Sequence, residues 1–252
     1  MPKISLPKGR RARLAMTALA VPVMALGVAA CGDDDDGAAD APTEAVDYEV
    51  TITNTNPGQP FTPPLVVTHA EEGQLFAVGE QASEAIQEIA ENGNLEPGLG
   101  LTGVTTVQGA ETPIVPTGSP AAGMFPDTVT FPVTAQPGEG LISWASMLIC
   151  TNDGFTGVDG LALPAEGETA SAMVNAYDAG TETNTEAFAD IVPPCQDLMG
   201  VSGDDGTGMS NPDLPEGGTS APPPGSSGHA DLGPDTPGWS DPVAEISVTR
   251  TS

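Results

Sequence analysis

Apolar and polar residues alternate along a stretch that begins near Val46 and marks the start of a folded domain. Tyr48, Val50 and Ile52 alternate with polar neighbours, and a period of two is typical of a half-buried β-strand. Further apolar runs predict strands at residues 65–68, 104–107, 128–134, 141–149, 170–176 and 243–248. Because short strands separated by Gly- and Pro-rich turns are typical of all-β domains, the pattern predicts a β-sandwich or a β-barrel.

A helical period occurs at one place, residues 80–92, and Gly93 follows it as a natural stop. The narrow apolar stripe of this helix consists of Ala82, Ile86, Ile89 and Ala90. One helix of this length cannot form a core by itself. We therefore expect it to lie against the sheet or to cap one end of it.

Residues 200–240 are dense in Gly, Pro, Ser and Asp and show no hydrophobic period. Alone, this composition is typical of a disordered tail. Val243, Ile246 and Val248 follow it, however, as the predicted closing strand. We therefore predict one domain over residues 46–252, with residues 200–240 as a long loop inside it.

Residues 1–30 have the pattern of a signal peptide and take no part in the predicted fold. A basic front precedes an uncharged apolar stretch, residues 14–30, which leads into Val28-Ala-Ala-Cys31. This ending resembles a bacterial lipobox, in which Cys31 becomes the first residue of the mature protein and carries lipid. An uncleaved anchor helix is the alternative. The pair Arg10-Arg11 leaves the twin-arginine export route open.

Removal of residues 1–30 leaves a very acidic chain. Arg250 is then the one basic residue beside all 35 acidic side chains, which gives a formal net charge of −34. Nucleic-acid binding is excluded, because nothing is left to neutralise phosphate groups. Residues 31–45, which include four adjacent aspartates, are predicted to be a lipid-anchored acidic tether. The acidity itself has two explanations, a salt-rich habitat or a specific partner.

Cys150 and Cys195 are the two cysteines that remain once Cys31 is assigned to lipid. Because export permits oxidation, we predict a disulfide between them. It would close a loop of about 45 residues and stabilise the fold by on the order of 4 kcal/mol in the chain-entropy model.

Two acidic motifs lie inside that loop, each after a predicted strand. They are Thr151-Asn-Asp-Gly-Phe-Thr-Gly157 and Tyr177-Asp-Ala-Gly-Thr-Glu182. Ca²⁺ takes roughly six to eight oxygen ligands, which Asp153, Asp178 and Glu182 can supply together with backbone carbonyls on turns. Spacing alone favours the simpler alternative, turns whose carboxylates cap backbone N–H groups.

The two motifs also carry a resemblance to a known family. Asp153-Gly-Phe-Thr-Gly157, Tyr177-Asp-Ala-Gly-Thr-Glu182 and Asp241-Pro-Val-Ala-Glu-Ile-Ser-Val248 resemble the spondin domain of animal matrix proteins such as F-spondin and mindin and of bacterial exported proteins. Tyr48-Glu-Val-Thr-Ile-Thr-Asn54 and Pro63-Pro-Leu-Val-Val-Thr-His69 add to the resemblance. It extends over residues 46–252.

The resemblance implies an antiparallel β-sandwich that binds calcium near one end. Asp153 matches the acidic ligand of the first motif, Asp178 matches the first ligand of the second, and Glu182 stands where a second Asp is usual. Gly154 replaces a tryptophan that is common in the animal proteins. Glu139 is the nearest counterpart of a further upstream ligand.

We therefore expect an exported, lipid-anchored surface protein that binds Ca²⁺ and acts as a binding or adhesion module. Its partners would be the membrane, through lipid on Cys31, and a surface polymer or protein. The alternatives are a structural envelope lipoprotein in which calcium only aids folding, and an uncharacterised hydrolase. We do not expect an enzyme, because the sequence contains no Gly-x-Ser-x-Gly motif and no plausibly spaced Cys/His pair. Copper is disfavoured, because the few residues that directly follow Cys195 include no histidine.

Overall fold

The computed structural model describes residues 41–201, 206–233 and 238–252 of the 252-residue chain. The predicted signal peptide, Cys31 and most of the predicted tether lie outside these ranges. Within them, no helix is long and apolar enough to cross a membrane. The Pro42 carbonyl accepts a 2.7 Å hydrogen bond from the Gly138 N–H, so the end of the predicted tether already contacts the domain.

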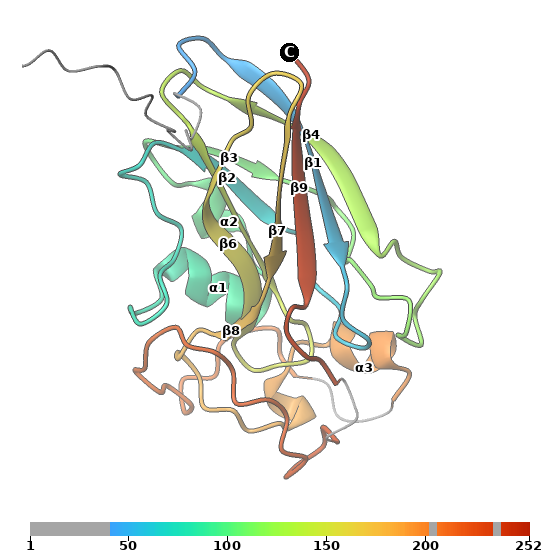
Figure 1. Ribbon diagram of the computed structural model, residues 1–252. Helices are drawn as coiled ribbons and strands as arrows, with labels where there is room; N and C mark the ends of the chain where they lie inside the picture. Colours follow the sequence, from blue (N-terminus) through green and yellow to red (C-terminus); the bar gives the residue numbers. More distant parts are fainter. Residues whose placement is uncertain (1–40, 202–205, 234–237) are drawn as a thin grey trace, which may run out of the picture. The chain divides into compact units, whose positions relative to one another are not determined.

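The strands form two antiparallel sheets, as expected for a β-sandwich (Figure 1). The first sheet has the order β4-β1-β9-β7, with β4 Thr128–Ala135, β1 Val46–Asn54, β9 Ala244–Arg250 and β7 Thr169–Val174. The second has the order β3-β2-β5-β6-β8, with β3 Thr105–Gln108, β2 Leu65–His69, β5 Leu141–Met147, β6 Gly154–Ala162 and β8 Ala176–Asp178.

The alternating pattern of β1 corresponds to one buried face and one more exposed face. Its apolar side chains pack in the main core with residues of both sheets, among them Phe131 of β4, Val248 of β9 and Trp144 of β5. Trp144 and Met147 are fully buried and supply core volume. The apolar positions of the two-residue period are thus those on the face of the first sheet that packs against the second sheet.

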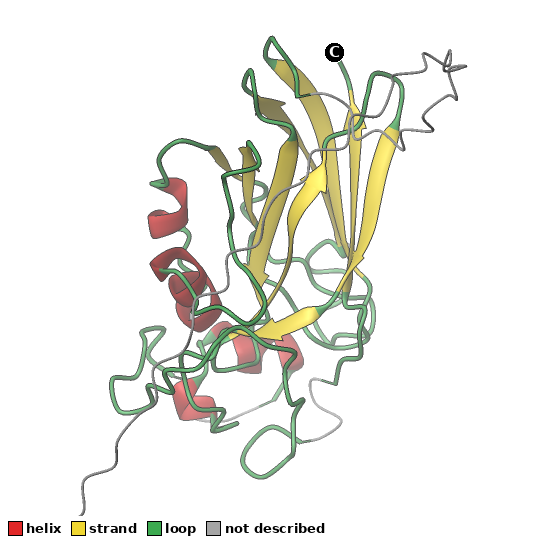
Figure 2. Ribbon diagram, turned by 60° about the vertical axis from the view of Figure 1, so that its left-hand side comes forward, coloured by secondary structure: helices red, strands yellow, loops and turns green. Residues whose placement is uncertain are grey.

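The second sheet is covered on both faces, and its strands β2 and β5 are therefore buried along almost their whole length. All five residues of β2 are buried. Helix α1, Glu84–Asn92, packs Ile86 and Ile89 against Leu65 and Phe155 of this sheet. Figure 2 shows helices beside the strands and others at the lower end of the sandwich. The expectation that the helix lies against a sheet is confirmed.

Helix α1 begins four residues later than predicted. The Ser83 side chain caps it by accepting a hydrogen bond from the Ile86 N–H, and Gly93 ends it in the left-handed conformation. Three further helices were not predicted: α2 Glu96–Leu99, the 3₁₀ helix η1 Phe188–Asp190 and α3 Pro194–Met199. With three to six residues each, they are too short to show a helical period in the sequence.

Two strand predictions need correction, and both corrections concern the acidic motifs. The predicted strand at residues 170–176 is two strands, because the chain leaves the first sheet after Val174 and joins the second sheet at Ala176. Residues 154–157, predicted as a turn, are the beginning of β6. The closing strand is confirmed as β9, and it pairs with β1 and β7.

Candidate functional site

The loop between β5 and β6 positions Asp153. The Thr151 hydroxyl donates a 2.6 Å hydrogen bond to the Leu148 carbonyl and accepts one of 2.9 Å from the Gly154 N–H. This closes a tight turn immediately before β6. Asp153 is its last residue and is fully buried, with an exposed fraction of 0%.

Strand β8 brings the second acidic motif beside the first. It pairs antiparallel with β6, and Asp178 lies opposite Gly154. The chain then turns at Gly180, which has a φ of 70°. A Cβ at this position would lie 2.6 Å from the backbone nitrogen of Thr219, so both the conformation and the close approach require glycine.

The Asp153 carboxylate joins the two motifs through its Oδ2 atom. This atom accepts hydrogen bonds from the Thr181 N–H at 2.7 Å, the Glu182 N–H at 3.0 Å and the Thr181 hydroxyl at 3.2 Å. The Oδ1 atom is buried and has no hydrogen-bond partner in the described part of the chain. Such an oxygen is costly unless a cation or proton neutralises it.

Asp178 supplies the second charge of this corner. Its Oδ1 accepts a 2.8 Å hydrogen bond from the Gly180 N–H, and its Oδ2 accepts one of 2.7 Å from the Asn184 side chain. Burial and then the negative charge of Asp178 raise the pKa of Asp153 to about 6, although the N–H groups of Glu182 and Thr181 lower it.

Glu182 contributes its backbone to this corner, but its side chain lies elsewhere. The Oε1 atom accepts a 2.6 Å hydrogen bond from the Asn211 N–H, and the side chain lines a separate cavity with Glu91 and Asp190. Burial is the largest cause that raises the pKa of Glu182 to about 7, and the charges of Glu91, Asp153 and Asp190 add to it.

Glu139 does not join the acidic corner. Its carboxylate accepts hydrogen bonds from the Thr68 hydroxyl and the Gln136 N–H at 2.7 Å, and from the backbone and hydroxyl of Thr105 at 3.1 Å. It precedes β5, whereas Asp153 follows that strand, so the two residues lie at opposite ends of it. Glu139 connects β2 and β3 to the turn before β5.

One feature of the corner fits a cation, namely that the unpartnered Oδ1 of buried Asp153 lies near a second carboxylate, that of Asp178. A cavity of about 20 Å³ next to Asp178 and Asn184 has room for one particle the size of a water. No group of three or more His, Cys, Asp or Glu side chains within the described ranges is arranged to hold a metal. A calcium ion would therefore depend on Asp153, Asp178 and backbone or water oxygens.

The long loop packs directly against the second motif. Asp178 and Ala221 exchange backbone hydrogen bonds of 2.8 and 2.9 Å, and the Gly218 N–H donates to the Gly180 carbonyl at 2.7 Å. Further along, the Thr183 N–H donates to the Leu214 carbonyl at 2.9 Å. Residues 214–221 of the predicted loop thus run beside residues 178–183, at the end of the sandwich where β8 lies (Figure 1).

Glu186 holds the far part of this loop and was not identified from the sequence. Its carboxylate accepts hydrogen bonds from the backbone N–H groups of Ser227 and His229. Burial raises the pKa of Glu186, but the hydrogen bonds from Ser227, His229 and Gly228 outweigh it, so the pKa lies below its usual value. Its φ of 56° is uncommon for a residue other than glycine. No local pattern distinguishes it from the other acidic residues.

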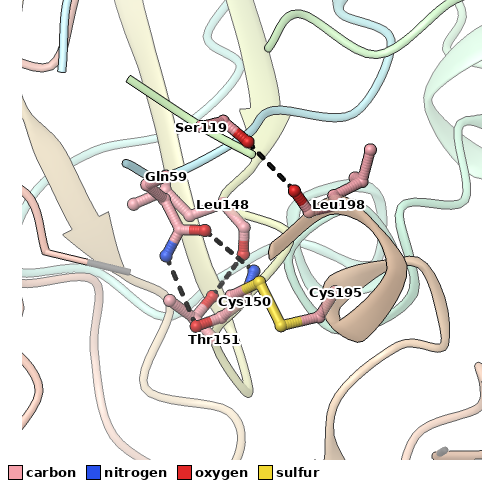
Figure 3. The surroundings of a disulfide bond; sticks show 7 residues. All are labelled: Gln59, Ser119, Leu148, Cys150, Thr151, Cys195 and Leu198. Atoms are coloured by element: carbon pink, nitrogen blue, oxygen red, sulfur yellow. Dashed lines mark hydrogen bonds between the residues drawn. A yellow bond between two sulfur atoms is a disulfide. The ribbon is translucent and has the colours of Figure 1, made fainter. Parts of the chain in front are cut away.

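The predicted disulfide between Cys150 and Cys195 is confirmed (Figure 3). It joins the loop that carries Asp153 to helix α3, with a Cα–Cα distance of 5.1 Å. Gln59 fixes Cys150 from the other side, because its side chain accepts a 2.9 Å hydrogen bond from the Cys150 N–H and donates one of 3.3 Å to the Cys150 carbonyl. The bridge therefore braces the corner at one end of the sandwich.

The fold and the site define an antiparallel β-sandwich with a disulfide-braced acidic corner. The family model Spondin_N matches residues 50–191, which include both acidic motifs. The chain therefore belongs to the Spondin_N family, as its motifs indicated. This family points to an extracellular or secreted protein and a binding or adhesion type of module. No curated protein matches the chain.

Proposed function

We propose that this chain is an exported, lipid-anchored surface module whose acidic corner binds Ca²⁺ through Asp153 and Asp178. The observation that carries the calcium proposal is the fully buried Asp153 carboxylate, whose Oδ1 has no donor within the described residues. Calcium would supply a charge that neutralises Asp153 and Asp178 together. Backbone donors from Thr181 and Glu182 already fix the orientation of the Asp153 carboxylate.

Calcium bound at the corner would also affect the long loop at the surface of the protein. Asp178 exchanges backbone hydrogen bonds with Ala221, so an ion held at Asp178 would also stabilise this part of the loop. A surface polymer or protein is the proposed partner of these loops. The lipid anchor at Cys31 would hold the module on the outer side of the membrane. The lipobox-like sequence Val28-Ala-Ala-Cys31 supports this anchor.

Direct calorimetric titration of the purified protein with CaCl₂ and with MgCl₂ tests the ion. We expect saturable binding of Ca²⁺, weaker binding of Mg²⁺ and loss of the calcium signal in Asp153→Asn. The exposed residue Glu49 offers a control of the same charge change, Glu49→Gln. Calcium binding that is equal in wild type and Asp153→Asn would refute the site.

A cell-attachment assay tests the adhesion function separately. Cells that carry the wild-type protein should attach better than cells whose protein lacks residues 46–252. Attachment that is lost in Asp153→Asn as well would connect adhesion to calcium. Equal attachment by all three would remove the adhesion proposal and favour a structural envelope protein.

A further inference from the structure

A second acidic site lies beside the calcium corner, in a cavity of about 290 Å³. Three segments place a carboxylate on its wall. Glu91 comes from the last turn of α1, Glu182 from the loop after β8, and Asp190 from η1. Residues 207–212 of the long loop close the cavity on another side.

Two of these carboxylates are buried and lack an opposite charge. Glu91 is 5% exposed and Glu182 is 4% exposed. The Glu91 Oε1 atom accepts a 2.9 Å hydrogen bond from the Gln87 side chain, but its Oε2 atom is buried without a partner among the described residues. Buried carboxylates are normally paired with a cation, so the unpartnered oxygen points to a ligand.

The described chain supplies no cation to this cavity. The polar partners of Glu182 and Asp190 there are neutral, namely the backbone and side-chain amide of Asn211 and the Thr185 hydroxyl. Within the described residues the one ion pair is that of His229 with Glu186. Arg250 donates instead to the Ser252 carbonyl, at the end of β9. A proton or a cation from outside the described residues is therefore what neutralises these carboxylates.

The size and walls of the cavity indicate what kind of cation fits. About 10–15 Å³ of this kind of volume is enough for one water, so the cavity is much larger than a bare ion needs. Val192, Ile191 and Met209 add apolar surface next to the carboxylates. An alkyl chain can pack against such a wall while its charged head reaches the acids. The cavity of about 20 Å³ at Asp178, by contrast, has the size of an ion.

We propose that this cavity binds an organic cation, an alkylammonium or alkylguanidinium group of the kind that ends a lysine or arginine side chain. The head would lie between the carboxylates of Glu91 and Glu182 and form charge-assisted hydrogen bonds with them, and the stem would contact Val192 and Met209. Glu182 is thus assigned to this site through its side chain and to the calcium corner through its backbone N–H. The inference goes beyond the calcium proposal and does not depend on it.

Calorimetric titration of the purified protein with N-acetyl-lysine methylamide and N-acetyl-arginine methylamide tests the site. The buffer contains a chelator and no divalent cation, and its ionic strength is constant. We expect saturable binding of at least one of these probes. The uncharged isostere N-acetyl-norleucine methylamide and tetramethylammonium chloride should not bind, because one lacks the charge and the other lacks N–H donors.

Glu91→Gln and Glu182→Gln should each weaken binding of the charged probe at least tenfold. Glu84→Gln serves as the control, because Glu84 lies exposed on the same helix and the substitution changes the charge equally. Unchanged affinity in both cavity variants would overturn the proposal. So would binding of tetramethylammonium or of Mg²⁺ that is as tight as binding of the lysine and arginine probes.

Two further arms identify the source of the cation and separate this site from the calcium site. Tighter binding of a lysine-containing peptide than of free cadaverine indicates a polypeptide partner, and the reverse indicates a small amine. Glu91→Gln should keep the wild-type response to Ca²⁺, and Asp153→Asn should keep binding of the organic cation. Failure of one site therefore does not imply failure of the other.

Discussion

The Asp153 carboxylate accepts a 2.7 Å hydrogen bond from the backbone N–H of Thr181, a residue 28 positions further along the chain. This bond joins the two acidic motifs into one corner. It forms because the chain leaves the first sheet after β7 and joins the second as β8, which pairs with β6, so that residues 178–182 pass over Asp153. The corner is therefore a product of the sheet topology, and the proposed calcium site depends on that crossing.

Stability should fall as the pH rises through the titration range of Asp153. Its pKa is raised from 3.8 to about 6, so the folded state binds more protons than the unfolded state between these values. The stabilisation is fully present below about pH 4 and is lost as the pH rises through about 6. In chelator, Asp153→Asn should remove this component, on the order of 2–3 kcal/mol.

Urea unfolding of wild type and Asp153→Asn, repeated in half-unit steps from about pH 4.5 to about pH 8, measures the free energy of unfolding at each pH. Glu49→Gln, at an exposed position of β1, is the matched control for the loss of one charge. A difference between wild type and Asp153→Asn that stays constant over the whole range would contradict the assignment. Glu182 has a pKa of about 7, so the free energy of unfolding of both proteins should continue to fall as the pH rises through about 7.

Gly157 should be intolerant of alanine. A Cβ there would lie 2.1 Å from the Trp144 carbonyl oxygen, across the pairing of β5 with β6. Because the obstacle is backbone, the strands must shift, and we expect a loss of about 1–3 kcal/mol of unfolding free energy. Gly233→Ala is the control, because its Cβ would meet no atom within 4 Å. Equal stability of the two variants in urea would show that the close approach does not matter.

The disulfide should contribute substantially to stability. The two cysteines are 45 positions apart in the sequence, so loss of the bridge should cost up to about 4 kcal/mol in the chain-entropy model. Thermal unfolding of the Cys150→Ala/Cys195→Ala double variant measures the cost without leaving a free thiol. A midpoint that matches the oxidised wild type would mean that the surrounding apolar cluster and Gln59 hold the corner without the bridge.

Glu186 should determine the order of the loop around Ser227 and His229. Glu186→Ala leaves these two N–H groups without their carboxylate acceptor, which we expect to cost about 1–3 kcal/mol. Hydrogen exchange should therefore become faster at Ser227 and His229 and stay unchanged in the paired strands β1 and β9. The exposed residue Glu166 provides the control substitution, Glu166→Ala. Exchange at Ser227 that is equally slow in both variants would contradict this role.

Much of the fold could be predicted from periodic patterns, because a face buried against a partner leaves a period in the sequence. The alternation in β1 and the apolar stripe of α1 are of this kind. Strand β6 was missed because Gly154, Gly157 and Gly160 resemble turn residues, whereas the close approach of the Trp144 backbone requires glycine at position 157 and a φ of 72° favours it at position 160. The switch of sheets at Asn175 leaves no periodic signal at all.

The candidate site was predictable in its residues but not in their directions. Asp153 and Asp178 do lie together, as the two motifs indicated. Glu182 is only four residues from Asp178, yet its side chain lies in a different cavity, because Asn211 of the long loop holds it there. Glu91 and Asn211 are far from the motifs in sequence, and only the packing of the loop brings them to Glu182.

Thermal unfolding of the metal-stripped protein, with calcium titrated back against magnesium, tests the central claim most directly. Calcium that binds only the folded state stabilises it by about 2.7 kcal/mol at 100 times its dissociation constant. The midpoint should therefore rise by about 5–10 °C in wild type and Glu182→Gln, and much less in Asp153→Asn and Asp178→Asn. Equal midpoint shifts with calcium and magnesium, or an undiminished calcium shift in Asp153→Asn, would contradict the calcium site. The stabilisation would then come from general screening of an acidic surface.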